Sequence, residues 1–101
     1  MVARPMAPLT LVLLTYVVPI EQVNAQRDAH VAWIEGAIDE GVMLLAGRKS
    51  TVDGGVLLFR GKSDVVEAFA RTDPYVMSGV ATIDVIGFAA SLAMDTVAEL
   101  L

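Results

Sequence analysis

The stretch Leu9–Val18 (LTLVLLTYVV) constrains the fold most, because it is apolar on both of its alternating faces. A strand of this kind must be covered above and below. Thr10, Thr15 and Tyr16 are its polar interruptions, and Pro19 ends it. The sequence therefore predicts a central strand in a sheet that is buried on both sides.

Further elements follow this strand in a regular order. The sequence predicts a helix over Ile20–Glu40, strands over Val42–Ala46 and Val56–Arg60, a helix over Ser63–Arg71, a strand over Ala81–Phe88 and a short helix or tail over Leu92–Leu101. Asp53-Gly54-Gly55 is a turn signal between the second and third strands. The order β-α-β-β-α-β is typical of the ferredoxin-like plait, an α+β fold with two helices on one face of a four-stranded antiparallel sheet. We expect a single domain over residues 1–101, with a core at about 9–88 between a short leader and a C-terminal helix or tail.

The plait leaves one sheet face without helices, yet the predicted strands are apolar on both faces. A second copy of the same sheet, related by a two-fold axis, is the simplest cover for that face. The composition agrees, since 55% hydrophobic residues is a large share for a chain of 101 residues to bury alone. We therefore predict a homodimer, or a higher oligomer built from it.

The charge and the cysteine content limit which partners the protein can bind and which catalytic groups it can use. The formal net charge is −5 and the seven basic residues do not cluster, which argues against nucleic-acid binding. Cysteine is absent, which excludes disulfides and thiolate chemistry. With one histidine and no paired-ligand spacing, we predict no metal site and no cofactor.

The apolar run also has some features of a secretory signal peptide. Arg4 precedes it, and Val23–Ala25 loosely matches a small-residue cleavage site. Against this alternative, Pro5 and Pro8 precede the run, and the run leads directly into a helical pattern. The run is too short to span a bilayer. We expect a cytoplasmic protein without membrane contact, with a signal sequence over residues 1–25 as the alternative.

The single histidine, His30, lies on the expected buried face of the first helix. At about 100° per residue it shares that face with Val23, Ile34, Ala37 and Ile38. A polar ring turned toward a core needs a hydrogen-bond partner there. His30 is either a general acid/base, a role that histidine can fill near neutral pH, or a core residue whose ring forms a hydrogen bond with a backbone carbonyl or a buried threonine.

Several short features occur together in a recognisable order. His30 lies in the first helix, Ala46-Gly47 follows the second strand, Gly54-Gly55 lies in the hairpin, and DPYVMSGV at 73–80 leads into the last strand. In these features, and over roughly Leu11–Phe88, the chain resembles the YciI-like family. The resemblance implies a dimeric α+β barrel in which two ferredoxin-like sheets face each other. The chain departs from it at Arg48, where members often have proline.

The resemblance also implies an active site built on a histidine and an aspartate, in a cleft between the helices and the sheet. These roles fall on His30 and Asp73. Asp73 has a structural explanation as well, because Asp-Pro is typical of an N-cap followed by Pro74 at the first helical position. A capping carboxylate is held rigidly and could also orient an imidazole. A nucleophile that would complete a triad is not evident, with Ser50 and Ser78 the open candidates.

Four further residues are candidates for substrate binding: Trp33, Tyr16, Tyr75 and Arg48. Trp33 lies on the side of the helix next to the His30 face. Tyr16 lies late in the first strand, and Tyr75 lies beside Asp73. Each aromatic either packs in the core or interface or lines a small pocket. Arg48, with Lys49, either attracts an anionic substrate or belongs to a solvated loop.

These residues support more than one function. The first hypothesis is a cofactor-independent enzyme of lyase or isomerase type, in which His30 transfers a proton of a small cyclic or anionic molecule and Asp73 orients the ring. The alternative is a non-catalytic dimer that binds a small molecule or a partner. The third is a purely structural dimer with no pocket. A solvent-reachable cavity beside His30 distinguishes the first two from the third.

Overall fold

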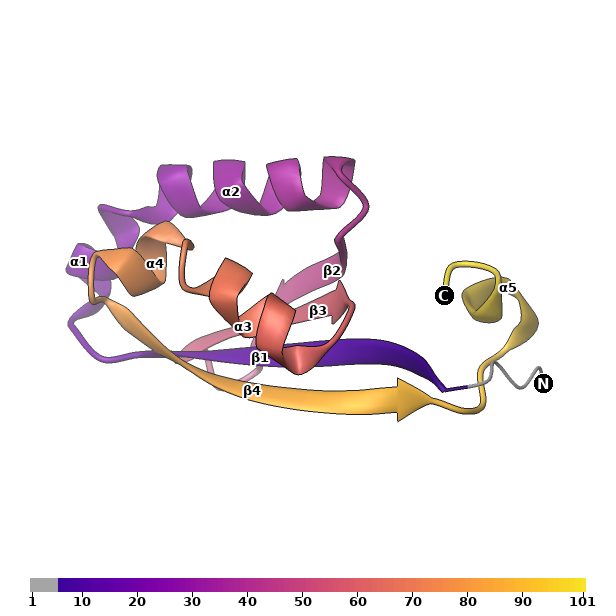
Figure 1. Cartoon of the computed structure of the whole chain (residues 1–101). Helices are drawn as coiled ribbons and strands as arrows, with labels where there is room; N and C mark the ends of the chain where they lie inside the picture. The colour runs from indigo at the N-terminus through magenta and orange to yellow at the C-terminus, as the bar shows by residue number, and fades with distance from the viewer. Residues whose placement is uncertain (1–5) are drawn as a thin grey trace.

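The computed structural model describes residues 6–101 as one four-stranded antiparallel sheet with helices on one face (Figure 1). In chain order the elements are β1 (Ala7–Tyr16), α1 (Ile20–Asn24), α2 (Arg27–Asp39), β2 (Met43–Arg48), β3 (Gly54–Arg60), α3 (Ser63–Ala70), α4 (Pro74–Met77), β4 (Ala81–Ala90) and α5 (Asp95–Ala98). The strand order is β2-β3-β1-β4. The predicted ferredoxin-like α+β plait is therefore confirmed. Arg4 and Pro5, which bear on the signal-peptide alternative, lie outside the described residues.

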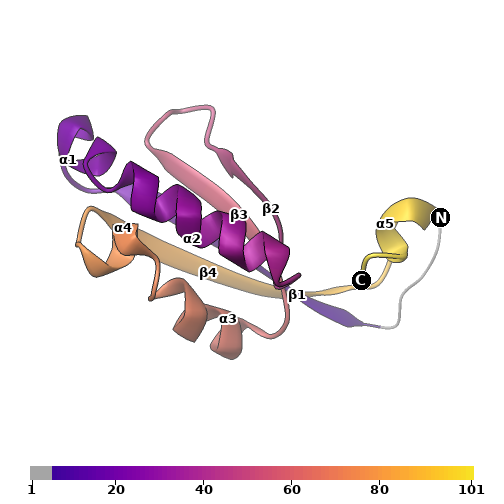
Figure 2. The same ribbon diagram turned by 90° about the horizontal axis from the view of Figure 1, so that it is seen from above.

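The predicted central strand is β1, which pairs with β3 on one side and β4 on the other. Val12 and Leu14 are buried on its helix-facing side. Such burial stabilises the fold by roughly 1.5–3 kcal/mol per side chain. Above this side, α2 lies over the β2–β3 hairpin, and α3 and α4 lie toward β4 (Figure 2). The core therefore fills the space between one sheet face and the helices.

The predicted helix over Ile20–Glu40 is wrong in one respect, because a turn divides it into α1 and α2. The backbone N–H of Gln26 donates to the carbonyl of Val23 (2.9 Å), an i to i−3 bond that closes α1. On α2, His30 and Ala37 are buried as expected, but Ile38 is exposed. Ile38 lies about 80° from His30 around the helix, outside the covered stripe.

The expected turn at Asp53-Gly54-Gly55 is also wrong, because both glycines belong to β3 and Gly54 pairs with Thr15 of β1. The chain reverses earlier, around Val52, whose φ is +63°. A Cβ on Gly54 would lie 1.8 Å from the carbonyl oxygen of Leu14. This glycine is therefore needed for the close approach of two strands and not for the turn.

The second face of the sheet is apolar and no helix lies on it in the described part of the chain (Figure 1). Ile86 and Phe88 of β4 and Leu45 of β2 are exposed there, at 49%, 45% and 53% of their surface. Leu11 and Leu13 of β1 lie between them and are half-buried. The C-terminal segment with α5 lies against one end of this face, where it lines a cavity together with Leu9, Leu58 and Phe88. The two-sided apolar pattern of the strands thus leaves a broad uncovered surface in the isolated chain.

Among residues 6–101, none of the helices has both the length and the apolar character that a membrane span requires.

We expect the substitution Gly54→Ala to destabilise the fold by about 1–3 kcal/mol or more, because the added methyl group overlaps the Leu14 carbonyl. Urea unfolding monitored by circular dichroism measures the loss. Gly36→Ala on α2 is the matched control, since no atom lies within 4 Å of its Cβ position. Alanine should be neutral there or gain up to about 1 kcal/mol. Equal stability of the two variants would contradict the close-approach explanation.

Candidate active site

His30 and Asp73, which lie 43 positions apart in the chain, are in contact in the folded protein. His30 lies near the start of α2, and Asp73 immediately precedes α4. The His30 Nδ1 and Asp73 Oδ1 atoms are 2.7 Å apart. Both residues are buried, with 8% and 1% of their surface exposed. The folded chain thus brings together the two side chains to which the family resemblance assigns the central roles.

Asp73 is held rigidly because the same oxygen also caps α4. Asp73 Oδ1 accepts a hydrogen bond from the backbone N–H of Tyr75 (3.0 Å), and Pro74 occupies the first turn of the helix. The capping interpretation and the orienting interpretation are therefore compatible. The other oxygen, Oδ2, is buried and has no hydrogen-bond partner in the described structure. A desolvated carboxylate of this kind interacts strongly with a cation or donor beside it.

The contact with Asp73 determines which nitrogen of His30 bears the proton. An ionised carboxylate only accepts hydrogen bonds, so the neutral imidazole is expected to donate from Nδ1. Within residues 6–101 the ring makes no second hydrogen bond. In the neutral ring, Nε2 is then the nitrogen without a proton, and His30 lines a pocket that a ligand can enter.

Two tyrosines fix the environment of the imidazole. The Tyr75 ring stacks on His30 with a centroid distance of 3.7 Å and an interplanar angle of 8°. The Tyr16 ring meets Tyr75 edge-on at 5.8 Å. Burial raises the pKa of Tyr75, a shift that Tyr16 increases and Arg27 opposes. The Tyr75 hydroxyl therefore stays protonated at neutral pH and can serve as a hydrogen-bond donor.

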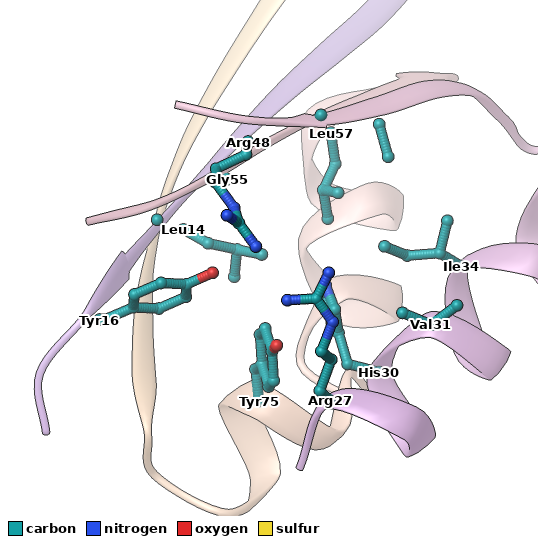
Figure 3. Close-up of a pocket in the computed structure, with 13 residues that line it drawn as sticks. Leu14, Tyr16, Arg27, His30, Val31, Ile34, Arg48, Gly55, Leu57 and Tyr75 are labelled. Atoms are coloured by element: carbon teal, nitrogen blue, oxygen red, sulfur yellow. The ribbon is translucent and has the colours of Figure 1, made fainter. Parts of the chain in front are cut away.

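His30 lies in the wall of an open pocket of about 310 Å³ between α2, α4 and the helix-facing side of the sheet (Figure 3). That volume is at the lower end of the range found for small-molecule sites. Gly55 forms part of the pocket wall. It lies on the helix-facing side of β3, as do Leu57 and Phe59 farther along the strand. The missing side chain at Gly55 therefore leaves room at this end of the core. The lining residues are Leu14, Tyr16, Arg27, His30, Val31, Ile34, Ala46, Gly47, Arg48, Gly54, Gly55, Leu57 and Tyr75.

Three of the four residues predicted to bind substrate line this pocket, namely Tyr16, Tyr75 and Arg48. The expectation for Trp33 needs correction, because this side chain is not in the lining. Its Nε1 donates to the Thr72 hydroxyl (3.0 Å), and its ring stacks on Phe69 at 5.0 Å. A residue three positions after His30 is rotated by about 60° around the helix, which turns Trp33 toward α3.

Arg27 is a pocket residue that the sequence interpretation missed. A signal was present, because residues three positions apart on a helix lie on the same side and Arg27 precedes His30 by three. Lys49 is directed elsewhere, and its Nζ donates to the Thr15 hydroxyl (3.2 Å). Neither Ser50 nor Ser78 lines the pocket, so no serine stands beside the His30 ring in that lining.

No group of three or more histidine, cysteine, aspartate or glutamate side chains that could hold a metal ion occurs in the described range 6–101.

The YCII-related domain family matches residues 8–89, and the chain belongs to that family. The fold of this chain is similar to that of 5-chloro-2-hydroxyhydroquinone dehydrochlorinase from Burkholderia phenoliruptrix AC1100, whose structure was solved in complex with 2,5-dihydroxybenzoquinone. The two share 22% sequence identity with a TM-score of 0.62, over 77% of this chain and 90% of the other. No curated protein matches the sequence.

We expect long-range ¹H–¹⁵N NMR to show a neutral His30 protonated at Nδ1 and bare at Nε2, because Asp73 accepts from Nδ1. The spectrum is simple, since the chain has one histidine. In Asp73→Ala the ring loses that acceptor, and the more common Nε2–H form should become populated. An Nε2–H signal as the main form in the unsubstituted protein would contradict the inferred arrangement.

Proposed function

We propose that this protein is an enzyme that moves a proton of a small cyclic or anionic molecule, with His30 as general base and acid and Asp73 as its orienting partner. The observation that supports this most is the 2.7 Å contact between the two buried side chains in the wall of an open pocket. A histidine that served the core alone would not need to face a cavity of about 310 Å³.

In the proposed reaction, His30 Nε2 removes a proton from a carbon or oxygen atom of the substrate. The electron pair of the broken bond stays on the substrate and forms an enolate, or expels a leaving group. The resulting imidazolium is stabilised by the Asp73 carboxylate and by the face of the Tyr75 ring. Returning the proton to another atom of the substrate gives an isomerase. In the lyase route the leaving group departs with the electron pair of its bond, and the imidazolium passes its proton to the leaving group or to water. Neither route needs a cofactor to balance protons or electrons.

Negative charge that builds up on the substrate would meet suitable partners in the pocket. Tyr16, Arg27 and Arg48 line it together with the protonated hydroxyl of Tyr75 (Figure 3). Donors of this kind stabilise a developing oxyanion when water is partly excluded.

The similar dehydrochlorinase supports a lyase-type reaction on a small ring. Its name describes the removal of chloride from a hydroxylated ring, and its structure contains a dihydroxybenzoquinone. Elimination of hydrogen chloride starts with the loss of a proton, which is the step assigned to His30.

We expect His30→Asn to slow the reaction by about 10²- to 10⁴-fold, the usual contribution of a general base. Deuterium incorporation in D₂O is measured by NMR on a panel of small cyclic ketones and hydroxylated rings. The panel includes 5-chloro-2-hydroxyhydroquinone, for which chloride release is also followed.

Glu35→Gln is the control, since Glu35 is exposed on the outer side of α2 and should leave the rate unchanged. Full activity of His30→Asn would remove His30 from the chemistry. If the compounds bind without exchange or chloride release in the unsubstituted protein, the pocket serves a non-catalytic binding module instead.

We further propose that two copies pair through the helix-free face of the sheet to form a dimer. Leu45, Ile86 and Phe88 expose large apolar side chains there, beside the half-buried Leu11 and Leu13. The exposed Asp84, opposite Leu13, also lies on this face, but an exposed cluster of large apolar side chains is typical of subunit interfaces. A two-fold axis would place the same apolar face of a second copy against it.

We expect Ile86→Lys to convert the dimer into a monomer, because a lysine at the centre of an apolar interface loses its hydration. Light scattering after size-exclusion chromatography gives the molar mass. Val65→Lys is the control, since Val65 is an equally apolar residue on α3, 67% exposed and away from this face. A monomeric unsubstituted protein, or an Ile86→Lys variant that stays dimeric, would contradict the proposed interface.

A further inference from the structure

A second cavity, of about 220 Å³, adjoins the pocket of His30. It is lined by Tyr16, Ile20, Asn24, Arg27, Arg48 and Val52. Tyr16, Arg27 and Arg48 line both cavities. Figure 3 shows the guanidinium groups of both arginines extending into the pocket of His30. The arginines come from different parts of the fold, the first residue of α2 and the last residue of β2.

The electrostatics of these cavities differ from those of the whole chain. The chain has 12 acidic and 7 basic residues, yet neither cavity is lined by an aspartate or a glutamate. Neither Arg27 nor Arg48 forms an ion pair within residues 6–101, whereas Arg71 is paired with Glu67. Two neighbouring guanidinium groups without a counterion repel each other, and Arg27 also lies at the positive end of α2. An anion bound between them would relieve this repulsion.

We propose that Arg27 and Arg48 bind a carboxylate group of a ring-containing substrate. A guanidinium presents two parallel N–H donors that match the two oxygens of a carboxylate. The inner cavity is bounded by apolar side chains such as Leu14, Ile34 and Leu57, which suits a flat ring beside His30. The outer cavity leaves room for a substituent next to the carboxylate. This inference rests on the proposed use of the inner cavity by a small molecule, but it does not depend on proton transfer.

The test uses 4-fluorobenzoate and its neutral analogue 4-fluorobenzamide as probes, with ¹⁹F NMR titration of the full chain. The carboxylate should bind about tenfold or more tightly than the amide, and added salt should weaken its binding. Arg27→Gln and Arg48→Gln should each weaken benzoate binding about tenfold without affecting the amide. Arg71→Gln removes the same charge away from the cavities and is expected to change nothing.

Equal binding of the two probes, including no binding of either, would overturn the assignment, as would an unchanged affinity in Arg27→Gln or Arg48→Gln. Tighter binding of phenyl phosphate than of benzoate would overturn the choice of carboxylate. His30→Asn separates this inference from the proposed reaction, since it should keep benzoate affinity within about threefold while turnover is lost. A fully active His30→Asn would end the proposed reaction and leave the carboxylate site intact.

Discussion

The hydrogen bond between His30 Nδ1 and Asp73 Oδ1 is the interaction on which the rest of this site depends. It ties α2 to the turn that starts α4, two elements from opposite halves of the chain. The same turn places Tyr75 against the face of the imidazole. Removing the imidazole would take away one of the two hydrogen-bond donors to the buried Asp73 Oδ1, which typically costs about 1–3 kcal/mol. The pair therefore contributes to the packing as well as to the proposed chemistry.

Charge is separated across the site in a way that suits an anionic reactant. The carboxylate of Asp73 is buried behind the imidazole, whereas Arg27 and Arg48 lie at the pocket. In the proposed reaction, His30 as the proton acceptor and the two arginines farther out act on one molecule at the same time. The space for that molecule exists because β3 has a glycine at position 55, next to the close strand contact at Gly54.

The architecture could be predicted from the sequence because its signals are local and strong. Strands that are apolar on both faces and helical periodicity led to the βαββαβ order and to His30 on a buried helix face. Asp73 became a candidate through the family resemblance, because the Asp-Pro pattern by itself indicates a helix cap. The errors have a different origin. The break between α1 and α2 and the strand position of Gly54 depend on contacts between distant segments, which a local pattern does not contain. The prediction for Trp33 was wrong because a side chain only about 60° from His30 around the helix can face either the pocket or the core. Here Trp33 packs against Phe69 of α3, and the helical pattern alone does not contain the position of α3.

The most direct test of the central claim is a double-mutant cycle on the rate of deuterium exchange, with His30→Asn, Asp73→Asn and the doubly substituted protein. Asp73→Asn keeps an oxygen that can cap α4 and removes the negative charge. If Asp73 acts through His30, each single substitution lowers the rate and the double variant is no slower than His30→Asn alone. Independent, multiplicative losses would show that the two residues do not work as one unit and would contradict the account.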